Sequence, residues 1–77
     1  MRVVEITREP VELFKVLKFE GMVASGGEAK QVIAEGQVRV NGESETRKRK
    51  KIVSGDTIEF EGDIIRIQLK GPETRHE

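Results

Sequence analysis

The chain has 77 residues, no cysteine, and 14 Lys plus Arg against 14 Asp plus Glu, so its formal net charge is zero. This length supports one hydrophobic core, and the lack of cysteine excludes the disulfide framework or thiolate metal site that could otherwise supplement core packing. Because the sequence has neither the roughly 18 to 20 apolar residues of a membrane-spanning helix nor a secretory signal pattern, we expect a cytoplasmic protein with no membrane partner.

The chain opens with a β-prone stretch, residues 3–6, and continues into an amphipathic helix predicted over residues 10–20. Pro10 suits the first turn of that helix, and Gly21 supplies its end. Its apolar stripe consists of Leu13, Phe14, Val16 and Leu17. Phe19 lies off this stripe, and we expect it to cover the sheet.

A second helix is predicted after Ser25. Glu28 follows three residues later, in the capping-box spacing in which each side chain satisfies a backbone group of the other, and Gly36 ends the helix. Its buried stripe consists of Ala29, Val32 and Ile33. Because only about four residues separate the two helices, we expect them to pack as a close pair.

Beyond the second helix the apolar residues alternate, which predicts strands. Val38 and Val40 face one way while Arg39 faces the other. Asn41-Gly42 follows directly, and this dipeptide indicates a tight hairpin turn that needs positive φ.

A final hairpin is predicted from residues 57–60 and 64–69, which alternate around a turn at residues 61–63. The order of elements indicates an α+β domain over residues 1–70, in which two short packed helices lie against a small, mostly antiparallel β-sheet. Residues 71–77 have no apolar content and are expected to form a disordered tail.

Catalytic chemistry has little support in the sequence. The only histidine, His76, lies in the tail, there is no thiol, and no serine stands in a nucleophile setting with a base nearby. Glu59, Glu61 and Asp63 could form a metal or acid–base cluster, but a solvated edge that discourages strand aggregation is the favoured interpretation. We therefore predict no enzyme, no catalytic residue, no metal and no cofactor.

The start of the second helix could bind an anion. Ser25 is followed by Gly26 and Gly27, two residues without side chains at the end where helix amides are unpaired and the helix dipole is positive. Lys30 lies on the flank of the same helix and could reach a phosphate oxygen. The alternative is that the glycines only shape the connection and that Lys30 is ordinary surface.

Residues 47–51 place more than a third of the positive charge in five consecutive residues, Arg47, Lys48, Arg49, Lys50 and Lys51. Such a run also occurs as a solvated loop or an import signal. Here it lies between a hairpin turn and a strand, so we expect it to be held within a structured sheet and to lose little entropy on contacting phosphates. Arg39, which points away from the buried face of its strand, would extend the patch.

The aromatic content limits how bases could be read. The chain has three phenylalanines and neither Trp nor Tyr, which predicts no platform for stacking splayed bases. Phe14 and Phe60 fit core positions. Any bound nucleic acid is therefore expected to be read through phosphates, shape and 2′-hydroxyls.

Two sequence motifs resemble those of a known family. The string G-x-V-x-V-N-G at residues 36–42, followed by G-D-x-I at residues 55–58, is similar to the RNA-binding domain of small-subunit ribosomal protein four, also called the alpha-L motif. The resemblance covers about residues 11–60. SGGEAK together with NGESETRKRKKIVSGDTIEF resembles most closely the small stand-alone bacterial proteins of the YbcJ type.

The resemblance implies RNA bound across the second helix and the following β-loop, with Ser25, Lys30, Asn41 and residues 47–51 as contacts; Asn41 could equally be only a turn residue. We therefore predict a non-enzymatic, monomeric protein that binds structured RNA, with ribosomal RNA as the expected target. The alternative is a protein-interaction adaptor whose basic run grips an acidic partner.

Overall fold

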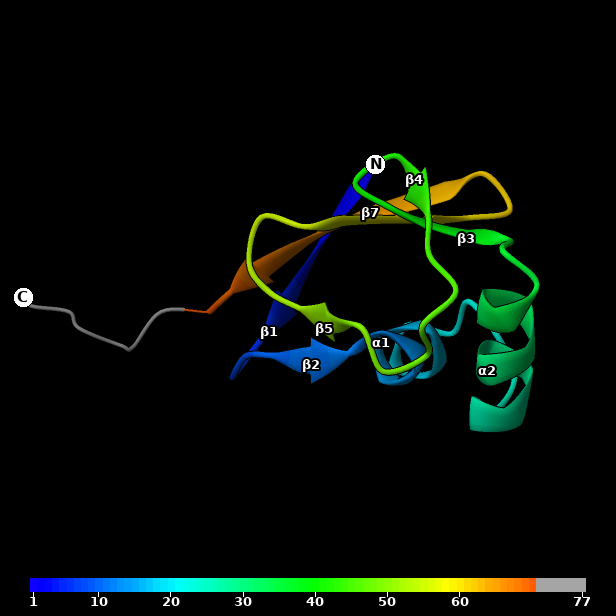
Figure 1. Ribbon diagram of the computed structural model, residues 1–77. Helices are drawn as coiled ribbons and strands as arrows, with labels where there is room; N and C mark the ends of the chain where they lie inside the picture. Colours follow the sequence, from blue (N-terminus) through cyan, green and yellow to red (C-terminus); the bar gives the residue numbers. More distant parts are fainter. Residues whose placement is uncertain (71–77) are drawn as a thin grey trace, which may run out of the picture.

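The computed structural model describes residues 1–70, in which two helices pack against a five-stranded sheet and a two-stranded sheet lies beside them (Figure 1). The helices are α1 (Leu13–Phe19) and α2 (Gly26–Ala34). The strands are β1 (Arg2–Ile6), β2 (Val11–Glu12), β3 (Val38–Val40), β4 (Glu43–Ser44), β5 (Lys51–Ile52), β6 (Thr57–Phe60) and β7 (Asp63–Leu69). The predicted α+β class is confirmed, and the predicted tail, residues 71–77, lies outside the described residues.

The larger sheet has the strand order β1-β7-β6-β3-β4, and only the β1–β7 pair is parallel. Its two tight turns are those that the sequence predicts. Asn41 and Gly42 have φ values of 54° and 86°, and Glu61 and Gly62 have values of 52° and 82°. Left-handed conformations at both central residues match the right-handed twist of the flanking strands. This requirement explains Asn41-Gly42 and Gly62, whereas Glu61 is a residue type that seldom adopts positive φ.

A single apolar cluster holds the two helices and both sheets together. Its fully buried members come from every layer, namely Leu13, Leu17, Ala29, Ile33, Val38, Ile52, Ile58 and Ile65. Val38 and Val40 are buried and Arg39 is exposed, as the alternation predicts. Burying each large aliphatic side chain contributes about 1.5–3 kcal/mol, so a chain without disulfides depends on this cluster.

The N-terminus of α2 carries the predicted cap. Ser25 Oγ accepts a hydrogen bond from the Glu28 amide at 3.1 Å, while the Glu28 carboxylate accepts one from the Ala24 amide at 2.9 Å. The reciprocal bond thus reaches one residue further back than a capping box requires. Gly36, with φ of 77°, follows the helix end.

The predicted first helix over residues 10–20 is wrong at its beginning, because α1 begins at Leu13. Val11 and Glu12 are extended and pair antiparallel with Ile52 and Lys51 of β5. Pairing with a strand about forty residues away in the sequence therefore draws two residues out of the predicted helix.

Phe19 also departs from expectation. Its side chain is 69% exposed, so it does not cover the sheet. It is the last residue of α1 and lies off the stripe formed by Leu13, Val16 and Leu17, which points at the core. Within residues 1–70, neither helix has the length and apolar character to span a bilayer.

Candidate nucleic-acid interface

Residues 47–51, here called the basic loop, are fastened to the beginning of α1 by backbone hydrogen bonds. The amides of Leu13 and Phe14 donate to the carbonyls of Lys50 and Lys48 at 2.9 and 3.1 Å. The N-cap residue Glu12 makes no side-chain capping bond, so the loop itself satisfies amides that the helix leaves unpaired. The prediction of a loop held within the sheet needs correction, since the loop is held chiefly by α1 and only Lys51 lies in a strand, β5.

Two of the five cations already have carboxylate partners. The Arg47 guanidinium makes two hydrogen bonds to the Glu45 carboxylate, at 2.9 and 3.2 Å, and the Arg47 amide donates a third at 2.9 Å. The side-chain hydrogen bond from Arg47 is the main reason that the pKa of the Glu45 carboxyl falls to about 2. Arg49 lies 3.3 Å from the Glu12 carboxylate. Burial alone would raise the pKa of Glu12, but the hydrogen bond from Arg49 and the charge of Lys15 outweigh it and lower the pKa.

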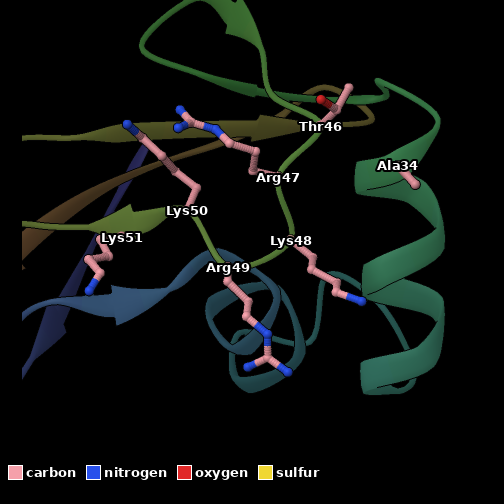
Figure 2. A pocket seen from close by; sticks show the side chains of 7 residues that line it. All are labelled: Ala34, Thr46, Arg47, Lys48, Arg49, Lys50 and Lys51. Atoms are coloured by element: carbon pink, nitrogen blue, oxygen red, sulfur yellow. The ribbon is translucent and has the colours of Figure 1, made fainter.

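The other three cations of the loop are lysines, of which Lys50 lies close enough to Glu45 to help lower the pKa of that carboxyl. Within residues 1–70, Lys48, Lys50 and Lys51 form no ion pair, and Lys48 and Lys51 are exposed. Figure 2 shows their side chains spreading from the loop, with Lys48 reaching toward α2. An open hollow of about 770 Å³ lies among the loop, Thr46 and Ala34 of α2.

Phe14 joins the basic loop to α2. The ring centroid lies 4.8 Å from Lys30 Nζ, 5.6 Å from Arg49 Cζ and 5.9 Å from Lys15 Nζ. Each contact places a cation against a π face, which is favourable by about 0.5–1 kcal/mol at exposed sites. Half-buried Phe14 therefore holds cations from α1, α2 and the loop together, so Lys30 lies beside the basic loop.

Gly26, the first residue of α2, borders a second hollow. This hollow, here called the α1 groove, has a volume of about 640 Å³ and includes Gly26, Phe14, Lys18 and Lys51 in its lining. A Cβ atom on Gly26 or Gly27 would meet its nearest neighbour only at 4.0 or 3.9 Å, so internal packing does not require either glycine. The Glu28 carboxylate in the first turn partly offsets the helix dipole there, which makes Ser25, Gly26 and Gly27 secondary to the lysines.

Two further predicted residues lie apart from this surface. Arg39 is exposed on the face of β3 opposite to the core, and its register partner there is Glu59. Both ends of the Asn41 amide are used within the fold, because Nδ2 donates to Asp56 Oδ1 at 3.0 Å and Oδ1 accepts from the Thr57 amide at 2.9 Å. These bonds support the turn role for Asn41.

Three acidic residues of the final hairpin, Glu59, Glu61 and Asp63, lie in β6, in the turn and in β7. Within residues 1–70 no group of three His, Asp or Glu side chains is placed to hold a metal ion. The Asp63 carboxylate accepts a hydrogen bond from Arg2 at 2.9 Å, and Glu61 occupies the turn. Asp63 therefore ties the hairpin to β1.

Several residues of the interface were not predicted as such. Phe14 is expected in the core. Lys15 and Lys18 are not predicted as contacts, although their spacing of three residues places them on one face of the helix. Glu12 reaches Arg49 only in the folded chain, and Glu45 pairs with Arg47 two residues away. No sequence pattern distinguishes these two glutamates from other surface carboxylates. The spacing of Lys15 and Lys18 is the one usable signal.

Several known proteins are similar to this chain in sequence. A protein-family model, that of the S4 domain, matches residues 4–68. YbcJ of Escherichia coli (strain K12) is 54% identical over 57 residues, which cover 74% of this chain and 81% of YbcJ. The probable ribosome maturation protein RlbA of Bacillus subtilis (strain 168) is 37% identical over 59 residues, covering 77% and 83% of the two chains.

The fold has a solved counterpart as well. The solution structure of YbcJ from E. coli, described as having an alpha-L motif involved in RNA binding, superposes with a TM-score of 0.66 at 46% identity. The match covers 86% of this chain and 85% of that one. The resemblance suggested by the glycine and valine motifs is therefore confirmed.

Proposed function

The chain belongs to the S4 domain family, and from this premise we propose that it is a non-enzymatic protein that binds structured RNA through the basic loop and the neighbouring face of α1 and α2. The RNA is recognised chiefly through its phosphates. Lys48, Lys50, Lys51 and Lys30 are assigned as the principal contacts, with the arginines of the loop, Ser25 and the amides of Gly26 and Gly27 beside them.

One observation carries this proposal. Three lysines without ion pairs within residues 1–70 stand on a loop whose backbone is bonded to α1 at Lys48 and Lys50. A loop whose backbone is already fixed loses less conformational entropy when phosphates bind its lysines than a flexible basic tail would lose. The pairs made by Arg47 and Arg49 fix the loop further, so these side chains position the lysines even where they do not touch the ligand.

The relatives support RNA as the ligand and ribosomal RNA as its expected source. The YbcJ structure is described as having a motif involved in RNA binding, and RlbA is named for ribosome maturation. Phosphate contacts give affinity and orientation without reading bases, which suits a folded RNA of defined shape. We propose that the protein acts in the cytoplasm and as a monomer.

The salt dependence of binding tests the proposal. If about four phosphates are neutralised, a plot of log affinity against log salt should have a slope of about −3 to −4, because each contact releases condensed counterions. The measurement is fluorescence anisotropy of a labelled RNA stem-loop titrated with the protein at several salt concentrations. Absence of RNA binding at low salt would contradict the proposal and favour an acidic protein partner for the same loop.

A further inference from the structure

The α1 groove differs in chemistry from the hollow of the basic loop. The apolar residues of its lining, here called the wall, are Pro10, Val11, Phe14 and Phe19. The lining also includes the cations Arg8, Lys15, Lys18 and Lys51 and, among residues 1–70, one carboxylate, Glu12. Apolar surface framed by positive charge suits a ligand that has a flat apolar part and an anionic part. The volume of about 640 Å³ lies in the range of about 300–1,000 Å³ typical of small-ligand sites.

Phe19 is the most unusual member of this wall. Its side chain is 69% exposed, whereas Phe60 is 4% exposed and belongs to the core. Phe19 also lines a third hollow of about 350 Å³ on the side of β1, so its ring stands between two concave surfaces. The exposed Phe19 ring is therefore accessible to a ligand in either hollow.

The cations near Phe19 are available. Within residues 1–70, Arg8 and Lys18 form no ion pair, while Lys15 lies 3.5 Å from Glu12. Lys15 and Phe19 are four residues apart on α1 and therefore share a helix face. If a nucleotide stacked its base on the Phe19 ring, its phosphate would lie near the positive charges of Arg8, Lys15 and Lys18.

The groove is continuous with the proposed RNA surface. Lys51 lines both the α1 groove and the hollow of the basic loop, and Phe14 lies in the groove wall while its ring holds Lys30 and Arg49. A strand of RNA whose phosphates follow the loop lysines would reach Phe19 without leaving the positive surface. This continuity favours a nucleotide over a separate protein partner as the occupant.

We propose that the α1 groove binds one unpaired nucleotide of the same RNA, with its base stacked on Phe19 and its phosphate near Lys18 and Arg8. The inference rests on the proposed function and adds a stacking contact that the low aromatic content of the sequence argues against. Its consequence is a preference for RNA in which a helix is flanked or interrupted by an unpaired base. Stacking tolerates any base, so the groove selects an extruded nucleotide by shape and not by sequence.

The test compares two RNA hairpins, one with a fully paired stem and one with the same stem carrying a single unpaired adenosine. The wild-type protein is expected to bind the bulged hairpin more tightly. Phe19→Ala should weaken binding to the bulged hairpin by roughly five- to a hundredfold, the range typical of losing one base–aromatic stack, and change binding to the paired hairpin by less than about twofold. Val3→Ala, which shortens an apolar side chain that is 56% exposed on β1, is the matched control and should alter neither affinity.

A spectroscopic readout separates stacking from an indirect effect. The chain has no Trp, so Phe19→Trp introduces a single reporter. Its fluorescence should be quenched by the bulged hairpin and not by the paired one, with affinity retained. Equal losses of Phe19→Ala on both hairpins, or an unquenched Trp in a bound complex, would overturn the nucleotide site. A wild-type protein that binds neither hairpin would refute the proposed function itself.

Discussion

Replacing Lys48 and Lys51 together by Glu is expected to reduce RNA affinity by about a hundredfold or more while the protein stays folded. Both side chains are exposed and make no ion pair within residues 1–70. A hydrogen bond between charged groups contributes about 1.5–3 kcal/mol, and reversing the charge adds repulsion to the loss of two such bonds. Anisotropy titration of the same RNA stem-loop at one fixed salt concentration measures the change.

The matched control is Arg66→Glu with Lys70→Glu. These exposed cations are on or just after β7, and Arg66 points away from the core because its neighbours Ile65 and Ile67 are buried. The control alters net charge by the same amount, so an equal loss of affinity in both double variants would mean that overall charge, and not the basic loop, determines binding. Reversing Arg47 or Arg49 is less informative, since it would place two carboxylates together at Glu45 or Glu12.

Ile52→Ala is expected to destabilise the protein by about 2–5 kcal/mol and to loosen the basic loop. Ile52 is fully buried, pairs with Val11, and directly follows Lys51, so its side chain anchors the end of the loop in the core. Small domains are stable by only about 5–15 kcal/mol, so this loss is a large fraction of the total. Urea denaturation measures the free energy of unfolding, and amide hydrogen exchange at Leu13 and Phe14 reports the loop contacts directly.

Ile52→Val provides the graded control, because removing one methylene group at the same site should cost only about 0.5–1.5 kcal/mol. RNA affinity should fall in Ile52→Ala even at temperatures where the protein is folded, since a loosened loop must be ordered again on binding. If Ile52→Ala unfolded at the same urea concentration as the wild type, or left the exchange of Leu13 and Phe14 unchanged, the anchoring role would be wrong.

Local sequence signals are sufficient for the parts of the fold that depend on neighbours in sequence. The cap at Ser25 and the glycine after the last helical turn predict α2, and Asn41-Gly42 predicts its hairpin, because each of these residue types satisfies a nearby backbone requirement. The beginning of α1 is not predictable in this way. Val11 and Glu12 are extended only because β5 pairs with them, and nothing in their own neighbourhood indicates that partner.

The candidate site likewise has parts that local sequence predicts and parts that depend on tertiary contacts. Charge density alone identifies the basic run, and the position of Lys30 on the flank of the second helix identifies that residue before the family resemblance supports it. The bond from Phe14 to the loop backbone and the gathering of Lys30 and Arg49 around its ring are tertiary contacts that periodicity cannot show. The exposure of Phe19 is not predictable either, since an apolar residue beside the buried stripe of a helix is ordinarily expected to be covered.

Mapping of backbone amide chemical shifts during titration with an RNA stem-loop tests the central claim most directly. With isotopically labelled protein, the amides of residues 47–51, Phe14 and Lys30 should shift progressively and saturate together, while those of Arg39 and Arg66 on the outer face of the sheet should not move. Saturable shifts confined to that outer face, with the basic loop unaffected, would contradict the assignment of the RNA-binding surface.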